Sequence, residues 1–194
     1  MKLYYSPGAC SLAAHIALHE VGTPFDSESV DLKTKTTISG ADFDAVTIKG
    51  YVPALVLDDG DLVTENIAIL DYLAGIYPQL ALEGPIGRTR LLEALAYIST
   101  EIHKSYKPFW HNGPDAQKAI ASAYITRRLQ YLADRVTGAY LLGDQPSVAD
   151  FYLFVTLLWA TRFGVAIPSA LVPVYDNLRA RPAVQATLAA EGLR

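Results

Sequence analysis

The pattern of apolar and polar residues changes character once along the chain. In the N-terminal part, Leu3–Tyr5 is a short apolar run that predicts a strand, and Leu12–Leu18, free of Gly and Pro, predicts a helix. Gly22 and Pro24 end that helix. Phe25–Leu32 then alternates polar and apolar residues as a second strand. A strand, a helix and a strand in succession form a βαβ unit, so we expect the two strands to be parallel.

A hairpin follows a polar stretch. Residues 33–49 are rich in Thr and poorly periodic, and we expect only a short helix around Ala41–Ala45. Two apolar runs then flank the turn Asp58–Asp61, which is a β-hairpin signal. Pro53 opens the first of these strands, where its missing N–H donor is tolerated.

The helix after the hairpin closes the α/β part. Its apolar positions from Ile67 to Tyr77 keep helical spacing, and Thr64 is its expected N-cap. Residues 78–87 contain two prolines and two glycines, and we interpret them as a linker. The expected domains are therefore 1–78, with the order βαβ then ββα, and 88–194.

No strand pattern appears after the linker. Helical spacing predicts helices over Arg88–Ser105 and Ala116–Val136, and shorter ones near Val172–Arg179 and after Pro182. The capping box 147–150 opens a further helix, through Phe163, that is apolar on nearly every side. At ~16 residues it is too short to span a bilayer, so we expect a buried central helix in an all-α domain.

Composition excludes several function classes. The 194 residues carry a net charge of −4 and are 51% hydrophobic, as in a compact globular protein. No basic cluster exceeds Arg127-Arg128, so nucleic-acid binding is not expected. Met1-Lys2 leads straight into a strand, and the single cysteine excludes an intrachain disulfide. We expect a cytoplasmic protein that does not bind membranes.

Cys10 is the main candidate for chemistry. Pro7 and Gly8 break the strand and turn the chain, which places Cys10 at or just before a helix N-terminus. The helix dipole there favours the thiolate and should lower the pKa of the thiol; the alternative is a small buried hydrophobic residue. Pro7 and Ala13 occupy the positions three residues away, so an internal dithiol cycle is excluded. A low-molecular-weight thiol is therefore the expected co-substrate.

Three further places could bind a peptide-like ligand. A cis bond at Val52-Pro53 would expose the Val52 backbone to the ligand, although a trans proline also suits a strand start. Glu65 and Asn66 at a helix N-terminus could receive an amino group and a carboxylate, or could simply cap the helix. Lys35 could pair with a ligand carboxylate, or could be a solvated side chain.

The remaining histidines and aromatic residues give weaker signals. His15 and His19 are four positions apart on one helix face, but no third ligand is apparent, so no metal site is expected. A histidine within a helix, such as His103, is more often a structural residue with its hydrogen bonds satisfied than a catalytic one. Tyr106 and Phe109 could line an apolar pocket for an electrophile, or could belong to the core.

Several segments together resemble beta-class glutathione S-transferases, the bacterial type that uses cysteine. The resemblance covers essentially the whole chain and is specific in combination. The matching segments are Tyr5–Leu12, Val30–Lys35, Lys49–Leu55, Leu62–Glu65, Tyr97–Lys104, Ser147–Asp150 and Ala189–Arg194.

The resemblance implies a cytosolic glutathione transferase fold: an α/β thioredoxin-like N-terminal domain followed by an all-α C-terminal domain. It implies a homodimer that uses glutathione as co-substrate and needs no metal, with Cys10 and His103 as catalytic residues. Some glutathione contacts would cross the dimer interface. The glutathione-binding residues that it implies are Tyr5, Cys10, Lys35, Tyr51, Val52, Pro53, Glu65, Asn66, Thr100, Glu101 and His103.

The implied activity is conjugation of glutathione to small apolar electrophiles in detoxification, reduction of glutathione mixed disulfides through Cys10, or both. Asn66, Ala96 and Thr47-Ile48 depart from the residues usual in the family. They motivate an alternative, a non-catalytic glutathione- or ligand-binding or interaction protein on the same scaffold. A glutathione-dependent isomerase or dehalogenase is also compatible with the sequence.

Overall fold

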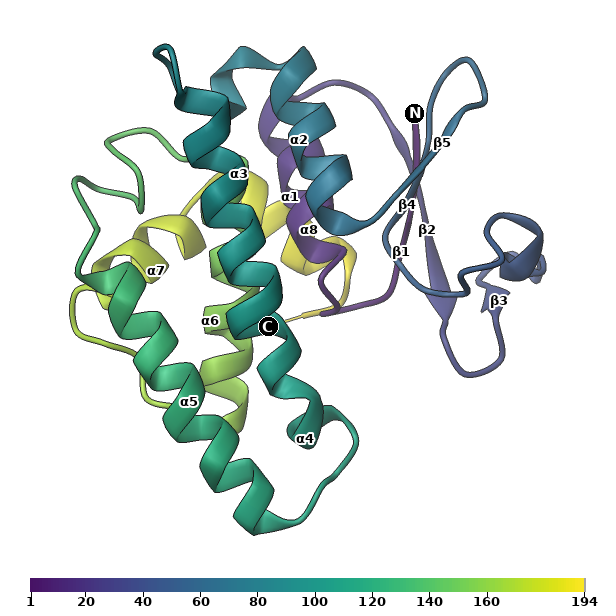
Figure 1. Cartoon of the computed structure of the whole chain (residues 1–194). Helices are drawn as coiled ribbons and strands as arrows, with labels where there is room; N and C mark the ends of the chain where they lie inside the picture. The colour runs from purple at the N-terminus through teal and green to yellow at the C-terminus, as the bar shows by residue number, and fades with distance from the viewer. Residues whose placement is uncertain (194) are drawn as a thin grey trace. The chain divides into compact units, whose positions relative to one another are not determined.

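The computed structural model describes residues 1–193, which form two compact units. One unit contains Met1–Leu80 together with the segment from Arg181 onward, and the other contains Ala81–Ala180. The sequence placed everything after residue 88 in one domain. In the structure the last helix, α8 (Pro182–Ala190), instead contacts α1 (Leu12–Val21) of the first unit (Figure 1).

A mixed five-stranded sheet of order β3-β2-β1-β4-β5 forms the centre of the first unit (Figure 1). β1 and β2 are parallel, which confirms the predicted βαβ unit, and the other neighbouring pairs are antiparallel. The β4–β5 pair confirms the hairpin. The strands are β1 (Lys2–Tyr5), β2 (Asp26–Asp31), β3 (Thr36–Thr37), β4 (Ala54–Val56) and β5 (Leu62–Thr64).

Both faces of β1 are covered. Tyr5 contacts His15 of α1, with ring centroids 4.7 Å apart. Tyr4 contacts Phe43, with ring centroids 5.6 Å apart. Neighbouring side chains of a strand point to opposite faces, so these two tyrosines reach different neighbours. Burial on both faces explains why Leu3–Tyr5 is apolar throughout.

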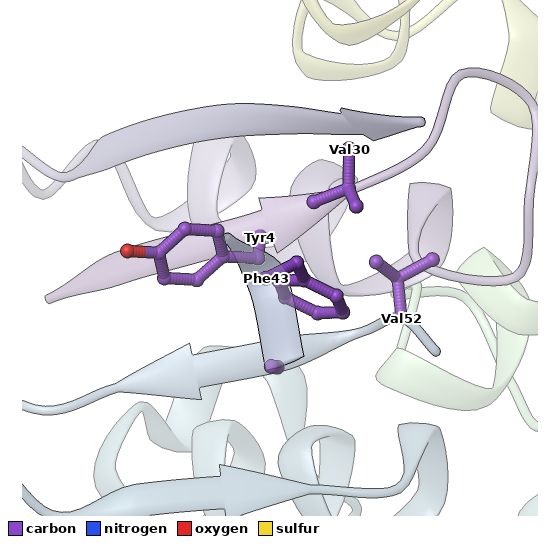
Figure 2. Close-up of a cluster of buried hydrophobic side chains, with 5 residues drawn as sticks. Tyr4, Val30, Phe43 and Val52 are labelled. Carbon is purple, nitrogen blue, oxygen red and sulfur yellow. The ribbon is translucent and has the colours of Figure 1, made fainter. Parts of the chain in front are cut away.

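Figure 2 shows the cluster that contains Tyr4 and Phe43. Val30 of β2, Ala54 of β4 and Val52 complete it, and all five side chains are buried. Val52 lies just before β4, outside regular secondary structure. Its buried side chain therefore holds an irregular piece of backbone in a fixed place against the sheet.

Three local expectations for this unit were inexact. The helix expected at 41–45 is a 3₁₀ turn, Phe43–Ala45, and the short strand β3 was not foreseen. Thr64 is not an N-cap, because the hairpin extends through it as part of β5. The cap position belongs to Glu65, and α2 spans Asn66–Ile76.

The second unit is helical in every element assigned within Ala81–Ala180. The central helix begins after Ser147, as predicted, and its residues from Val148 to Leu157 are buried. In the described part of the chain, no helix has both the length and the apolar character needed to cross a membrane. The α-helices of this unit are α3 (Gly87–Tyr97), α4 (Lys107–Trp110), α5 (Asp115–Ala133), α6 (Val148–Phe163) and α7 (Leu171–Arg179).

The helix expected over Arg88–Ser105 is not regular to its end. The α-helix stops at Tyr97, a π-helical turn covers Ile98–Ile102, and a 3₁₀ turn covers His103–Tyr106. The Thr100 hydroxyl donates to the Ala96 carbonyl at 3.0 Å, and the Ser105 hydroxyl donates to the Glu101 carbonyl at 2.8 Å. Such back-bonding competes with the regular ladder and bends helices, which gives a physical reason for the change.

Candidate active site

Cys10 lies in the turn between β1 and α1, just before the first helical residue Leu12. Its Sγ atom is 3.6 Å from the carbonyl oxygen of Val52, and the residue as a whole is partly buried. The turn is fixed by Ser11, whose hydroxyl accepts from the Ser6 amide at 3.2 Å. A thiol is thus presented at a helix N-terminus, beside an irregular backbone segment, as the sequence predicted.

The segment after α8 also holds this turn. The Glu191 carboxylate accepts from the Gly8 amide at 2.8 Å and from Nδ1 of His15 at 2.8 Å. The side chains of His15 and Glu191 are both buried. Leu193 lies 3.6 Å from the position that a Cβ atom on Gly8 would take. The start and the end of the chain therefore meet at the cysteine turn.

The His15 ring also stacks on His19, with centroids 5.1 Å apart. Among the described residues, no group of three or more His, Cys, Asp or Glu side chains is arranged to hold a metal ion.

The segment from Lys49 to Pro53 connects the other candidate residues. The Val52-Pro53 bond is cis, and the Val52 side chain is only 5% exposed. The Lys35 ammonium donates to the Gly50 carbonyl. Lys35 has a φ of 57°, uncommon for a residue other than glycine. This lysine therefore lies at the same irregular segment that contacts Cys10.

Glu65 is held in an unusual conformation at the start of α2. Its φ of 71° lies in the region that favours glycine. Its carboxylate accepts from the Lys49 ammonium at 2.7 Å and from the Tyr51 hydroxyl at 2.6 Å. Backbone conformations of this kind cost about 1–3 kcal/mol and cluster at ligand-binding positions.

Asn66, the first residue of α2, carries a buried amide without a partner. The residue is 8% exposed, and neither Oδ1 nor Nδ2 makes a hydrogen bond to the described residues. A buried polar group left unpaired costs about 1–3 kcal/mol. An amide at a helix N-terminus can pair with a ligand carboxylate that the helix N–H groups also favour.

The hairpin register brings these groups to one end of the sheet. Ala54 of β4 is opposite Thr64 of β5, so Val52 and Asn66 extend from the same end of the hairpin. Beside the cysteine turn, an open pocket of about 440 Å³ is lined by Ser6, Pro7 and residues 29–33. In the first unit, hydrogen bonds and chain adjacency thus connect seven predicted site residues: Cys10, Lys35, Tyr51, Val52, Pro53, Glu65 and Asn66.

His103 belongs to the second unit, where it follows the π-helical turn. Its Nδ1 lies 2.5 Å from the Tyr152 hydroxyl. The rings of Trp110 and Trp159 meet the imidazole edge-on, with centroids 5.1 and 5.0 Å away. Burial, and to a smaller extent Lys104, lowers the pKa of His103 to about 4. The imidazole is therefore neutral at physiological pH.

The other predicted residues of the helical unit have local partners. Thr100 is exposed and bonds to the Ala96 carbonyl. The Glu101 carboxylate accepts from the Tyr124 hydroxyl at 2.6 Å and lies 3.0 Å from Arg128 Nε. Tyr106 has no exposed surface, and Phe109 is partly buried. The role of Tyr106 and Phe109 in an electrophile pocket stays a prediction.

Sequence reasoning missed the residues that support the site. Glu191 is 183 positions from Gly8, and Tyr152 is 49 positions from His103, so no local pattern joins either pair. The pairing of Lys49 with Glu65 was also missed, although the two side chains carry opposite charges.

Comparison with known proteins identifies the family of the chain. The family model described as glutathione S-transferase, N-terminal domain, matches residues 8–76, and its C-terminal counterpart matches residues 79–180. Glutathione S-transferase GstA of Escherichia coli O157:H7 is 41% identical over 100% of both chains.

Two solved structures are also similar over 100% of both chains. A sphingomonad glutathione S-transferase complexed with glutathione is 43% identical with a TM-score of 0.90. A bacterial beta-class glutathione S-transferase of Sphingomonas chungbukensis is 41% identical with a TM-score of 0.90. The chain therefore belongs to the glutathione S-transferase family, within its bacterial beta class.

Proposed function

We propose that the protein binds glutathione on its α/β unit and transfers it to small apolar electrophiles, or uses it to reduce mixed disulfides through Cys10. The buried unpaired amide of Asn66 carries the proposal, because it is a polar group that the protein itself leaves unsatisfied. Family membership supplies the ligand that the amide would meet.

The residues present fit the chemistry of glutathione. A γ-glutamyl tripeptide carries a thiol, two carboxylates, one ammonium group and peptide N–H and C=O groups. The site offers the main chain at Val52 to a peptide group and the ammonium of Lys35 to the glycyl carboxylate. The Glu65 carboxylate suits the ammonium, and the Asn66 amide suits the γ-glutamyl carboxylate.

Cys10 and His103 would carry different parts of the chemistry. In disulfide reduction, the Cys10 thiolate attacks the glutathionyl sulfur and expels the substrate thiolate; a second glutathione then releases glutathione disulfide and restores Cys10. In conjugation, the glutathione thiolate attacks the electrophile. Neutral His103 would donate a hydrogen bond to that sulfur. The helix N-terminus would stabilise the negative charge of the thiolate.

The same proposal includes a cytoplasmic homodimer in which Thr100 and Glu101 contribute to the glutathione site of the partner. The resemblance of Tyr97–Lys104 to the family supports it, as does the exposure of Thr100. Sedimentation of the protein at micromolar concentration should give twice the mass of one chain. A monomer that turns over glutathione normally would contradict the dimer but not the activity.

Replacement of Asn66 tests whether its buried, unpaired amide binds glutathione. Asn66→Leu keeps the shape of the side chain and removes the unpaired amide, so urea unfolding should show unchanged or increased stability. The loss of the amide should weaken glutathione binding about tenfold in calorimetric titration, a cost typical of one hydrogen bond to a charged group. Turnover of an aromatic halide and of a glutathione mixed disulfide should fall at low glutathione concentration.

Asn177→Leu is the matched control. The Asn177 amide donates to the Ala139 carbonyl at 3.0 Å in the helical unit. Its replacement should cost a little stability and leave glutathione binding unchanged. Equal glutathione affinity in Asn66→Leu and the native protein would refute the assignment of Asn66. A native protein that neither binds glutathione nor turns over either substrate would refute the proposed function.

A further inference from the structure

We infer that Tyr152 is a positioning residue for His103: its hydroxyl donates to Nδ1 and holds the imidazole in the tautomer that carries its proton on Nε2. The catalytic consequence of this inference rests on the proposed function, in which His103 donates a hydrogen bond to the glutathione sulfur. Its structural part concerns only two side chains of the helical unit, His103 and Tyr152.

The contact between the two side chains is short and enclosed. The Tyr152 hydroxyl lies 2.5 Å from Nδ1 of His103, and Tyr152 is 1% exposed. The two rings meet edge-on, with centroids 5.8 Å apart. Trp110 and Trp159 contact the imidazole as well, so the plane of the ring is fixed on several sides.

The direction of the hydrogen bond follows from acidity. A neutral imidazole has one N–H donor and one acceptor nitrogen, and the hydrogen bond of one nitrogen decides the state of the other. A phenol loses its proton near pH ~10, far more readily than a neutral imidazole N–H does, so the phenol is the better donor. Tyr152 therefore donates, Nδ1 accepts, and the ring proton resides on Nε2.

Nε2 is the nitrogen left for a ligand. In the part of the chain that the structure describes, no hydrogen bond to Nε2 is found, and His103 has no further polar partner. Nε2 is also not among the described buried polar atoms that lack a partner, so this atom is not completely buried. A neutral imidazole with its proton on Nε2 can donate a hydrogen bond to a thiolate from this place.

Packing alone does not explain a tyrosine at position 152. Its neighbours on α6 include Phe151 and Phe154, which are fully buried, so the interior accepts phenylalanine readily. A phenylalanine at 152 would fill the same space without a polar group to satisfy. The contact of the hydroxyl with Nδ1 of His103 gives a reason for a tyrosine at this position.

The first test needs no glutathione. Long-range ¹H–¹⁵N spectra of the native protein should show His103 with a protonated Nε2 and an unprotonated Nδ1, and the four histidines can be assigned by substitution. Tyr152→Phe should move both nitrogen shifts toward the values of mixed tautomers. Tyr175→Phe is the control, because Tyr175 is a buried tyrosine of the same unit whose hydroxyl accepts from Arg179 at 2.9 Å. It should leave the His103 signals unchanged.

The second test connects the tautomer to turnover. Tyr152→Phe should lower kcat for the aromatic halide about fivefold, as expected for one hydrogen bond, with the KM for glutathione unchanged. His103→Asn keeps an amide beside Tyr152 but lacks the Nε2 donor, and should lower kcat further. His103→Gln, which restores a donor near Nε2, should recover part of the loss. Tyr152→Phe should add nothing in the His103→Asn background, because it acts through the imidazole.

Unchanged His103 spectra in Tyr152→Phe, or a native ring protonated mainly on Nδ1, would overturn the inference. Additive losses in the double variant would show that Tyr152 acts on its own and would also overturn it. Full turnover in His103→Asn would overturn the catalytic half and the role proposed for His103. Failure of the native protein to bind glutathione would overturn the proposed function alone, since the spectra are recorded without glutathione.

Discussion

At the scale of single residues, two opposing influences act on the protonation of the Cys10 thiol. The N-terminus of α1 favours a thiolate, whereas the Val52 carbonyl at 3.6 Å accepts a hydrogen bond from the protonated thiol. Cysteine is a weak hydrogen-bond donor and a strong nucleophile, unlike the serine or tyrosine that could occupy such a position. Cys10 is therefore better suited to forming a bond with sulfur than to donating a proton to it.

Cys10→Ala should separate the two proposed activities. Reduction of glutathione mixed disulfides should fall by orders of magnitude, because no covalent intermediate can form. Conjugation to an aromatic halide should keep a substantial part of its rate, because His103 and the helix N-terminus remain. Both assays are normalised to bound glutathione. Equal losses in the two assays would make Cys10 a stabiliser of the glutathione thiolate instead.

His103 also makes stability depend on pH. Its pKa is about 4 in the folded protein and near 6.5 in the unfolded chain, so the unfolded chain binds more protons between these values. Stability should therefore fall as pH drops from 6.5 to 4, by on the order of 3 kcal/mol, and should be independent of this group above pH 6.5.

Urea unfolding across this window measures the effect. The free energy of unfolding should fall less steeply in His103→Asn than in the native protein. His19, whose pKa is also lowered by burial, contributes equally to both slopes. Glu28, with a pKa lowered from 4.5 to about 2 mainly by its hydrogen bond from Lys2, contributes only below about pH 4.5 and equally in both proteins. Identical slopes would mean that His103 titrates normally in the folded state.

At the scale of elements, α6 depends on the carboxylate of Asp150. This fully buried group accepts from the Ser147 amide at 2.9 Å, the Ser147 hydroxyl at 2.8 Å and the Leu141 amide at 2.8 Å. It therefore begins the helix and also fixes the loop that precedes it. The first of these bonds is one half of the predicted capping box.

Asp150→Ala should destabilise the protein by about 3 kcal/mol or more, since three buried donors lose their acceptor. Asp150→Asn, which keeps one acceptor oxygen, should lose less. Ser147→Ala, which removes only the hydroxyl, should be the mildest of the three changes. Chemical unfolding of the purified variants, or their soluble yield if they fold poorly, gives the order. A loss in Asp150→Ala no larger than in Ser147→Ala would contradict the role of the Leu141 bond.

At the scale of the whole molecule, the chain does not divide into two successive domains. The segment from Arg181 onward returns to the α/β unit, where Glu191 bonds to the turn that carries Cys10. The Arg181 guanidinium also pairs with Glu20 of α1. The end of the chain is consequently part of the structure that supports the candidate active site.

Glu191→Gln should lower stability by about 2 kcal/mol, because an amide cannot accept from both Gly8 and His15 in the same geometry. The KM for glutathione should rise, since the cysteine turn loses a support. Arg181→Gln is the control: it weakens the contact between α8 and α1 and leaves the Gly8 bond intact. It should lower stability without changing KM. Matching KM values in the two variants would show that the turn is independent of Glu191.

The sequence by itself determined the features that short-range patterns specify. The run Leu3–Tyr5, the break at Pro7 and Gly8, and the helix from Leu12 placed a thiol at a helix N-terminus, because strand, turn and helix each follow from neighbouring residues. The hairpin and the start of α6 after Ser147 were determined in the same way. The errors in secondary structure were the missed strand β3, the 3₁₀ turn at Phe43–Ala45 and the change of helix type after Tyr97. A further error concerned Thr64, where a strand and a cap compete.

Only the tertiary structure decided how distant residues meet. It paired Glu191 with the cysteine turn, placed Tyr152 against His103, and left the Asn66 amide buried without a partner. It also returned α8 to the first unit. Each of these depends on which surfaces pack together across long stretches of chain, and neither periodicity nor turn chemistry contains that information.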